Sequence, residues 1–305
     1  MTDTIIDISE SSAYLKVENK LLVVDRHENG KHTIPLKEIS VLLISSRAVT
    51  VTHAVLSGIT EAGGIIVVSN DRHQPSGMML PLQAHHLQTE RFIKQASASL
   101  PTNKNIWKKI IAAKIKNQAA LLTHLKGRDC GLSSLISKVR SGDPQNIEAL
   151  SAKKYWDELQ IVEKRDRSIP DNNIFLNYGY TVLHAAAARA ICSAGLHPTI
   201  GVHHHNRYNP FCLASDIMEP LRPLIDAAVI QIAENNIEEL NKNSKAILIK
   251  AVTNNKVCIA GEMQTVFRSL TRTATTLART YLDPNCAITL PELIFSQENF
   301  NGTDK

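Results

Sequence analysis

Three stretches in the second half of the chain carry side chains that could together bind a divalent cation. The first contributes Glu148, the second three consecutive histidines at 203–205, and the third Asp216 and Glu219. Asp216 and Glu219 stand three residues apart, so both carboxylates share one face of a helix. Several carboxylates with one imidazole suit Mg²⁺ or Mn²⁺ better than structural zinc. Such an ion polarises phosphoryl oxygens, so the chemistry it predicts is phosphodiester cleavage or transfer.

Glu148 lies on a helix that we expect to begin with Asp143 as N-cap and Pro144 at the first helical position. It shares a face with Ala152, Tyr155 and Leu159, which follow it by four, seven and eleven residues. An acid on an apolar face loses hydration, and a metal ion, a salt bridge or fraying of the first turn would each compensate for that loss. The residues alone leave these three explanations open.

The three histidines follow a helix terminator at Gly195 and Pro198, so we expect them on a strand or loop. On an extended chain His203 and His205 point away from His204, and one metal would take at most one or two of them. A lone histidine is more often a packing or hydrogen-bonding residue than a ligand, and the residues alone do not choose between these roles.

Ser215 is the expected N-cap of the next helix, which places Asp216 and Glu219 in its first turn. Acids favour that position because of the helix dipole, so the pair has an explanation without a metal. A histidine twelve residues before Asp216, together with Glu148, makes a larger set of ligand types than the dipole explains.

Basic residues are concentrated in one stretch, because no Asp or Glu occurs from residue 91 to residue 128. Nucleic acid is the obvious polyanion for such a run, through phosphate contacts and counterion release. The alternative is a solvated helix face, with the repulsion offset by distant acids. The residues we expect to contact DNA backbone are Arg91, Lys94, Lys104, Lys108, Lys109 and Lys116.

The elements that position these groups fall into two parts, which predict an α+β protein. Residues 1–88 are expected to form a small β-strand-rich, sandwich-like domain, with strands at 13–17, 21–26, 33–35, 41–44 and 65–68, a turn at Asn29-Gly30 and a helix at 52–62. Residues 89–295 are expected to form a larger all-α catalytic domain, with helical stretches at 107–122, 144–159, 182–194, 221–232 and within 247–277. A polar tail, 296–305, follows.

The whole-chain properties set broad limits. The 305 residues are enough for two modest domains, and 43% of them are hydrophobic, an ordinary globular value. No apolar run approaches the ~20 residues that cross a bilayer, and the first residues do not resemble a secretory signal, so we expect a cytoplasmic protein. The five cysteines form no CxxC pair and are expected to be reduced thiols. A net charge of +5 by itself decides little.

Four segments together resemble a known family. The segment GVHHHNRYNPFCLASDIMEPLRP, at 201–223, is similar to the signature of the CRISPR-associated integrase, the larger subunit of the spacer-acquisition complex. The stretch NIEALSAKKYW around Glu148, the helix NYGYTVLHAAAARAICSAGLHPTIG and the run SNDRHQPSGMMLPL resemble other parts of that family, in the same order. The likeness spans nearly the whole chain and is strongest to the branch that accompanies a single-protein RNA-guided effector nuclease.

The resemblance implies a metal site. The family's ligands fall on Glu148, His204 and Glu219, which are then also the catalytic residues, with Mg²⁺ or Mn²⁺ as cofactor. His204 is the histidine at the spacing that the family motif requires before Asp216 and Glu219. Asp216 matches a supporting acid, and Arg222, one turn after Glu219, is placed to pair with a carboxylate or to meet phosphate. The histidine triplet departs from the family's usual one or two.

The resemblance also implies the reaction and the partners. The 3′-hydroxyl of a short double-stranded DNA fragment attacks a phosphodiester at the end of a CRISPR repeat, a direct transesterification, and two such attacks insert the fragment. The family forms homodimers bridged by a small companion adaptation subunit, for which the β-rich domain is the expected dimerisation part. It leaves open whether the effector nuclease also docks, and it implies no membrane partner.

Two alternatives fit the same residues. A metal-dependent DNA nuclease acting in repair would use the same three ligands with water as the nucleophile, and only strand-joined products separate it from an integrase. A non-catalytic DNA-binding or scaffold protein would instead be indifferent to replacement of Glu148, His204 and Glu219.

Overall fold

The computed structural model describes residues 3–9, 12–26, 30–70, 75–166, 169, 171–283 and 285–295. The chain divides into two compact units, residues 1–88 and 89–305. Asn29 of the expected turn, residues 71–74 of the family-like run and the tail from 296 lie outside the described residues. No helix among the described residues is long and apolar enough to span a membrane.

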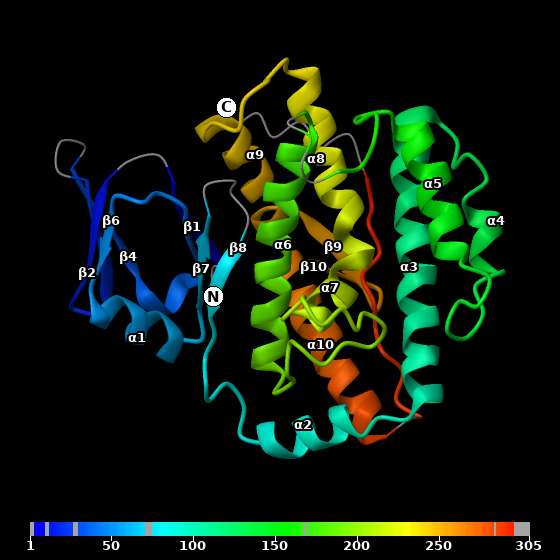
Figure 1. Cartoon of the computed structure of the whole chain (residues 1–305), viewed down its shortest axis with the longest axis horizontal. Helices are drawn as coiled ribbons and strands as arrows, with labels where there is room; N and C mark the ends of the chain where they lie inside the picture. The colour runs from blue at the N-terminus through cyan, green and yellow to red at the C-terminus, as the bar shows by residue number, and fades with distance from the viewer. Residues whose placement is uncertain are drawn as a thin grey trace. The chain divides into compact units, whose positions relative to one another are not determined.

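In its described residues, the first unit has two four-stranded sheets, one α-helix and one short 3-10 helix (Figure 1). One sheet has the order β1-β5-β7-β8, in which β1, β5 and β7 are parallel and β8 is antiparallel. The other has the order β4-β3-β2-β6. The elements are β1 (Thr4–Ile8), β2 (Ala13–Glu18), β3 (Leu21–Asp25), β4 (Lys31–Pro35), the 3-10 helix η2 (Leu36–Glu38), β5 (Ile39–Ile44), β6 (Val49–Val51), α1 (His53–Glu61), β7 (Ile65–Ser69) and β8 (Pro75–Met79).

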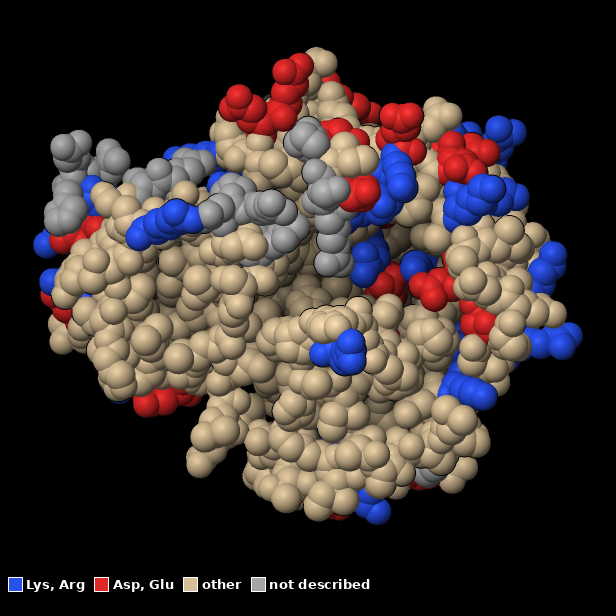
Figure 2. Space-filling view, viewed as in Figure 1, with Lys and Arg blue, Asp and Glu red and all other residues tan. Residues whose placement is uncertain are grey.

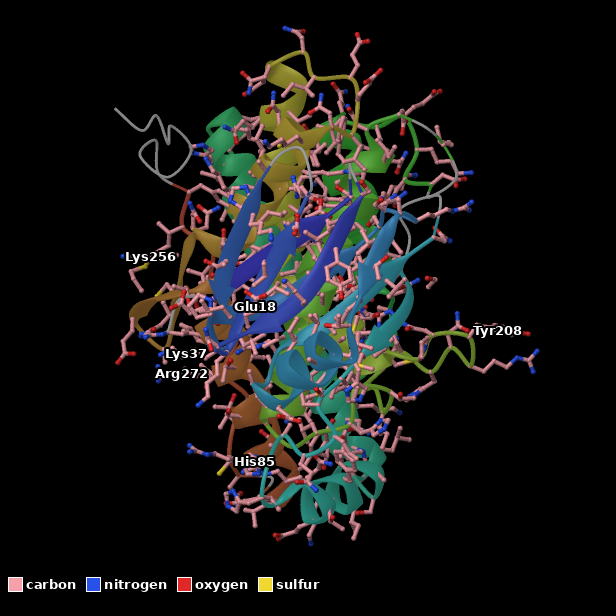
Figure 3. All side chains as sticks on the ribbon, turned by 90° about the vertical axis from the view of Figure 1, so that its left-hand side faces the viewer. Glu18, Lys37, His85, Tyr208, Lys256 and Arg272 are labelled. Atoms are coloured by element: carbon pink, nitrogen blue, oxygen red, sulfur yellow. The ribbon has the colours of Figure 1, made fainter. Side chains whose placement is uncertain are left out.

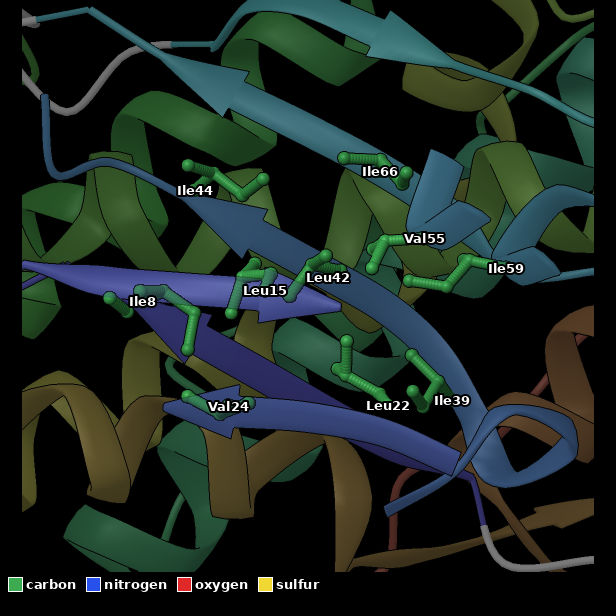
Figure 4. Close-up of a cluster of buried hydrophobic side chains, with 11 residues drawn as sticks. Ile8, Leu15, Leu22, Val24, Ile39, Leu42, Ile44, Val55, Ile59 and Ile66 are labelled. Atoms are coloured by element: carbon green, nitrogen blue, oxygen red, sulfur yellow. The ribbon is translucent and has the colours of Figure 1, made fainter. Parts of the chain in front are cut away.

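The core of this unit is built from the inward faces of both sheets and from α1 (Figure 4). Leu15 and Leu22 of the second sheet and Leu42 of the first are fully buried, and Val55 and Ile59 of α1 cover them. Side chains alternate across a strand, so every second residue of β2 reaches this core. The two sheets therefore enclose one apolar layer, which agrees with the sandwich-like domain expected from the sequence.

The sequence predicted most of these elements but not three of the strands or the short 3-10 helix η2. The expected strands and helix all occur, β3 and β4 form the predicted antiparallel hairpin, and Gly30 has the positive φ of +81° that such a turn uses. The missed strands are β1, β6 and β8. Each is short or at a sheet edge. Strands β1 and β6 pair with strands distant in the sequence, whereas β8 pairs with β7, the strand directly before it.

The second unit is mainly helical. Its elements are α2 (Gln88–Ala96), α3 (Leu100–Lys126), α4 (Ser133–Ile136), α5 (Ile147–Leu159), α6 (Asn173–Ser193), α7 (Cys212–Met218), the 3-10 helix η3 (Glu219–Leu221), α8 (Arg222–Glu234), α9 (Lys242–Thr253), β9 (Lys256–Ile259), β10 (Glu262–Thr265) and α10 (Val266–Leu282). The α+β class is confirmed, but the second part is not all-α, because β9 and β10 form an antiparallel hairpin before α10.

Helix α6 is the buried centre of this unit and packs against α7, α8, α9 and α10 (Figure 1). A Cβ added at Gly179 would overlap a methyl carbon of Ile225, so only glycine permits this closeness between α6 and α8. Helix α3 runs beside α5 and η3. Ser99 caps its start by accepting from the amide of Thr102, and Gly127 ends it with a positive φ.

Two expected N-caps were wrong, and the helix expected at 182–194 begins earlier, at Asn173. Helix α5 begins at Ile147 with Asn146 as N-cap, not at Pro144. The carboxylate of Asp143 still accepts from the amides of Ile147 and Glu148, at 2.9 and 2.8 Å, so it caps the helix from one turn outside. Ser215 is not an N-cap either, because it lies inside α7, whose N-cap is Phe211. The acids at 216 and 219 are therefore at the end of α7 and the start of η3.

Candidate metal centre

One face of α3 supports the whole candidate site. Trp107, Lys114 and Asn117 lie on this face, and Trp107 and Lys114 are two turns, about 10.5 Å, apart. All three are buried. Trp107 contacts the histidine loop, Lys114 contacts two glutamates, and Asn117 binds the segment that follows Glu219. Helix α3 thus fixes the separation between the histidine and glutamate parts of the site.

Lys114 joins Glu148 and Glu219. Its ammonium nitrogen lies 2.9 Å from Oε1 of Glu148 and 2.7 Å from Oε2 of Glu219. Burial lowers the pKa of Lys114, but the charges of Glu219 and Glu148 outweigh it and raise that pKa above its ordinary value. Lys114 is therefore a buried cation, stabilised by two carboxylates that come from different helices.

Glu219 is almost completely buried, with 4% of its side chain exposed, whereas 25% of the Glu148 side chain is exposed. Burial raises the pKa of Glu219, and the opposing charges of Arg222 and Lys114 hold it below its usual value, so the group is ionised. Nε of Arg222 lies 2.8 Å from Oε1. Oε2 lies close to Lys114 but without hydrogen-bond geometry, so this buried oxygen is balanced by charge and lacks a hydrogen-bond donor.

Asn117 positions the backbone that carries Glu219. Its amide nitrogen donates to the carbonyl oxygens of Pro220 and Pro291, at 2.7 and 3.0 Å. Its carbonyl oxygen accepts from the amide of Leu293 at 3.0 Å. A single buried side chain therefore holds η3 and the segment around residue 292 against α3.

His204 is oriented by Asp216. Its Nδ1 lies 2.5 Å from Oδ1 of Asp216, whose carboxylate also accepts from the backbone amides of Val202, His203 and His204. The hydrogen bond to Asp216 raises the pKa of His204. A proton held on Nδ1 by a carboxylate leaves the other ring nitrogen, Nε2, with its lone pair, as in metal-binding histidines.

The loop that carries His204 is fixed from two sides. The ring of His203 stacks on Trp107 with centroids 4.2 Å apart, and His204 meets Trp107 edge-on at 5.6 Å. A Cβ added at Gly201 would overlap the carbonyl oxygen of His204 and stand 3.0 Å from Oδ2 of Asp216, so this loop requires glycine there. His205 is exposed and lies on the side of a cavity of about 770 Å³ that His204, Arg207 and Tyr208 also line.

The structure brings together some of the sequence-predicted site residues and not others. Glu148 and Glu219 share Lys114, and Arg222 pairs with Glu219 as expected. Among the described residues, His204 has no hydrogen bond or ion pair with either glutamate, although the negative charges of both contribute to its raised pKa. Among the described residues, no three His, Cys, Asp or Glu side chains converge closely enough to hold an ion.

The donor set nevertheless fits a divalent cation. The ionised carboxylate of Glu219, the carboxylate of Glu148 and the oriented imidazole of His204 supply oxygen and nitrogen donors, and among the described residues Oε2 of Glu219 has no hydrogen-bond donor. Oxygen donors with one nitrogen are the ligands that Mn²⁺ and Mg²⁺ accept. The cation present between the glutamates here is the ammonium of Lys114.

The residues expected to contact DNA differ in their solvent exposure and in whether their charged groups are already paired within the protein. Lys104 and Lys108 are exposed on α3, and no carboxylate pairs with either among the described residues. Lys116 pairs with Glu292 at 2.7 Å, and Arg91 donates to the carbonyl oxygen of Ala194 at 2.6 Å. Lys94 is exposed and Lys109 is partly so. Basic and acidic side chains are accordingly interspersed on the face that Figure 2 shows.

Two features of the site were missed from sequence. Lys114 lies within the basic stretch 91–128 and has no special place in the sequence pattern, but it is an internal partner of the two glutamates. Asp226 is completely buried and accepts from the hydroxyls of Tyr155 and Tyr180, and the guanidinium of Arg222 lies 4.7 Å from the centre of the Tyr180 ring. The apolar positions of Ile110, Ile111 and Ile115 around Lys114 were the one available signal that position 114 is buried.

A helical unit that carries carboxylates and an oriented imidazole, with exposed lysines on α3, has the residue types of enzymes that act on nucleic acid. The family model described as "CRISPR associated protein Cas1" matches residues 6–260. A CRISPR-associated endonuclease Cas1 of Neisseria meningitidis serogroup C is 36% identical over 252 residues, which cover 80% of this chain and 81% of that protein. The chain therefore belongs to the Cas1 family of CRISPR-associated proteins.

Solved structures show the same fold. A casposase bound to integration product has a TM-score of 0.80 at 19% identity, and the match covers 100% of this chain and 96% of that one. A chain of a Cas6-RT-Cas1–Cas2 complex has a TM-score of 0.72 at 18% identity over 93% of this chain and 35% of that longer chain. At these identities the likeness is one of fold.

Proposed function

We propose that this protein is a metal-dependent DNA integrase of CRISPR adaptation, which joins the 3′-hydroxyl of a short DNA fragment to a phosphodiester at the end of a CRISPR repeat. The observation that carries the proposal is the arrangement around α3, where Trp107 fixes the histidine loop and Lys114 joins Glu148 to Glu219. Membership in the Cas1 family and the fold shared with a casposase that binds integration product support it.

Glu148, His204 and Glu219 would hold the metal ion, Mg²⁺ or Mn²⁺. When bound, such an ion stabilises negative charge on the attacking and leaving oxygens of the phosphodiester. Asp216 fixes the orientation of His204, and Arg222 holds Glu219 through its Nε. Because Arg222 also packs on Tyr180, it positions the carboxylate rather than reaching for phosphate.

DNA would reach this site along the exposed lysines of α2 and α3. Lys94, Lys104 and Lys108 provide charge for phosphate contacts, which position a duplex without reading its sequence. We further propose a homodimer formed through the β-rich unit and bridged by a small companion subunit. The named Cas1–Cas2 complex with the same fold supports a companion subunit.

A strand-transfer assay tests this function. The protein, its companion subunit, Mn²⁺ and a labelled short duplex are mixed with a plasmid that carries a repeat array. We expect wild type to join label to the plasmid and His204→Ala to lose joining by at least about 100-fold. His205→Ala is the matched control, because His205 is an exposed neighbour without the contacts to Asp216 and Trp107. Cleavage of the plasmid without joined label would support a repair nuclease instead.

A further inference from the structure

We propose that Lys114 is an internal cation that competes with the catalytic metal for Glu148 and Glu219, and so sets how tightly the metal is held. The inference rests on the proposed function, since it concerns the same two carboxylates. Lys114 touches no substrate in this mechanism and is a positioning residue.

The first argument is the charge of the glutamate pair. Glu148 and Glu219 supply two negative charges, and Lys114 and Arg222 supply two positive charges within ion-pair distance. The group is therefore neutral, although it lies largely out of water, where charge is felt most strongly. A divalent cation approaching it meets no net attraction while the ammonium stays in place.

The second argument is which oxygens are free. Oε2 of Glu219 faces Lys114 and Oε1 faces Arg222, so both oxygens of this buried carboxylate are engaged. Glu148 gives Oε1 to Lys114 and is the more exposed of the two. A metal ion would therefore bind Glu219 more tightly when one of the two cations withdraws, because a positive charge otherwise stands beside each oxygen. Lys114 is the one that can do so, because its flexible stem carries a point charge, whereas Arg222 is also fixed over Tyr180.

The third argument is why the sequence places a lysine there. A buried lysine is rare and costs stability unless it is paired. Without it, two carboxylates from α5 and η3 would face each other with only Arg222 to offset them. In the absence of metal, Lys114 holds both carboxylates in place through its two ion pairs, so the site is preformed and the metal can exchange.

Titration of Mn²⁺ into the purified full-length protein, followed by calorimetry and by the electron paramagnetic resonance of bound Mn²⁺, tests this inference. We expect Lys114→Met to bind Mn²⁺ about tenfold more tightly than wild type, because one of the two offsetting charges is gone. Lys114→Arg keeps the charge and should bind with wild-type affinity or more weakly. Lys116→Met is the matched control, since Lys116 lies two residues away on the exposed side and pairs with Glu292.

Thermal unfolding separates this role from a merely structural one. In EDTA, Lys114→Met should unfold at a lower temperature than wild type, and Mn²⁺ should raise its unfolding temperature more than it raises that of wild type. A structural role alone would lower both temperatures equally. If Lys114→Met does not fold, Lys114→Gln, which keeps a hydrogen-bond donor without the charge, is measured in its place.

The results distinguish this inference from the proposed function. Equal or weaker Mn²⁺ binding by the uncharged variant, with wild-type binding that is lost in His204→Ala, would overturn the inference and leave the metal site standing. Binding that His204→Ala does not alter in any of the variants would overturn the proposed metal site and the inference with it. Strand transfer by wild type is measured separately and depends on neither Lys114 variant.

Discussion

Nδ1 of His204 lies 2.5 Å from Oδ1 of Asp216, whose other oxygen accepts the backbone amides of Val202 and His203. One buried carboxylate therefore fixes both the fold of the histidine loop and the ring orientation of its central histidine. We expect Asp216→Asn to weaken Mn²⁺ binding by about 10- to 100-fold, because the neutral amide has one accepting oxygen and cannot serve both the ring and the backbone amides as the carboxylate does. Calorimetric titration checks this, with the exposed Asp157→Asn as control. Unchanged affinity would mean that His204 is not a ligand.

Trp107 holds the same loop from the side of α3. Trp107→Ala removes a buried ring that stacks on His203 and meets His204 edge-on, so it should lower the free energy of unfolding by about 3–5 kcal/mol. Trp107→Phe keeps an aromatic surface and should lose less stability and less strand transfer. Urea unfolding and the joining assay provide the two measurements. Equal effects of the two substitutions would contradict a stacking role.

Asn117 ties η3 to α3 by three hydrogen bonds. Asn117→Ala leaves two carbonyls and one amide unpaired in a buried place, and we expect a loss of about 2–4 kcal/mol in the free energy of unfolding. Strand transfer should fall with it, because Glu219 begins η3. Asn105→Ala, at an exposed position of the same helix, is the control and should change neither quantity.

Asp226 predicts a dependence of stability on pH. Burial raises the pKa of its carboxyl from 3.8 to about 6. The folded protein then binds this proton more tightly than the unfolded chain, so the contribution of Asp226 to stability falls as pH rises from about 4 to about 6. Asp226→Asn removes that dependence. We expect wild type to lose about 3 kcal/mol relative to the variant across this window, measured by urea unfolding at each pH. A constant difference would contradict the raised pKa.

The exposed lysines of α3 predict how DNA binding depends on salt. Lys104→Gln combined with Lys108→Gln should weaken binding of a duplex regardless of its sequence. The slope of log K against log salt should become shallower by about 0.9 for each phosphate that the variant no longer neutralises. Lys116 and Lys126 are already paired with Glu292 and Glu158, so their substitution should have a smaller effect. Fluorescence anisotropy at several salt concentrations measures both. Equal slopes for the Lys104→Gln/Lys108→Gln variant and for a variant with Lys116 and Lys126 both replaced by Gln would contradict this distinction.

The loop around Tyr208 shows what sequence patterns do not settle. Tyr208 is 77% exposed and points away from the body of the helical unit at the tip of its loop (Figure 3), although the residues before it pack on Trp107. Strand alternation predicted opposite directions for His203 and His204, yet both rings meet Trp107, because the segment is an irregular loop held by Asp216.

Local sequence patterns predicted which helices and strands form better than they predicted where a helix begins or which side chains pair across elements. The helical stripe of α3 and the apolar runs of β5 and β7 are properties of adjacent residues, so periodicity predicted them. The start of α5 depends on Asn146 adopting a left-handed conformation, which no pattern specified. Lys114 pairs with Glu148 and Glu219 because three helices, α3, α5 and η3, pack together. The sequence around Lys114, a run of basic residues, does not indicate this pairing.

The most direct measurement of the central claim uses two labelled duplexes that differ only at their 3′ ends. One ends in a 3′-hydroxyl and the other in a 3′-deoxy nucleotide, and each is incubated with the protein, its companion subunit, Mn²⁺ and a plasmid carrying the repeat array. We predict joined label only from the 3′-hydroxyl duplex, and none from either duplex in EDTA. Nicked or cut plasmid in equal amount with both duplexes, without joined label, would contradict this mechanism, since water rather than the DNA end would then be the nucleophile.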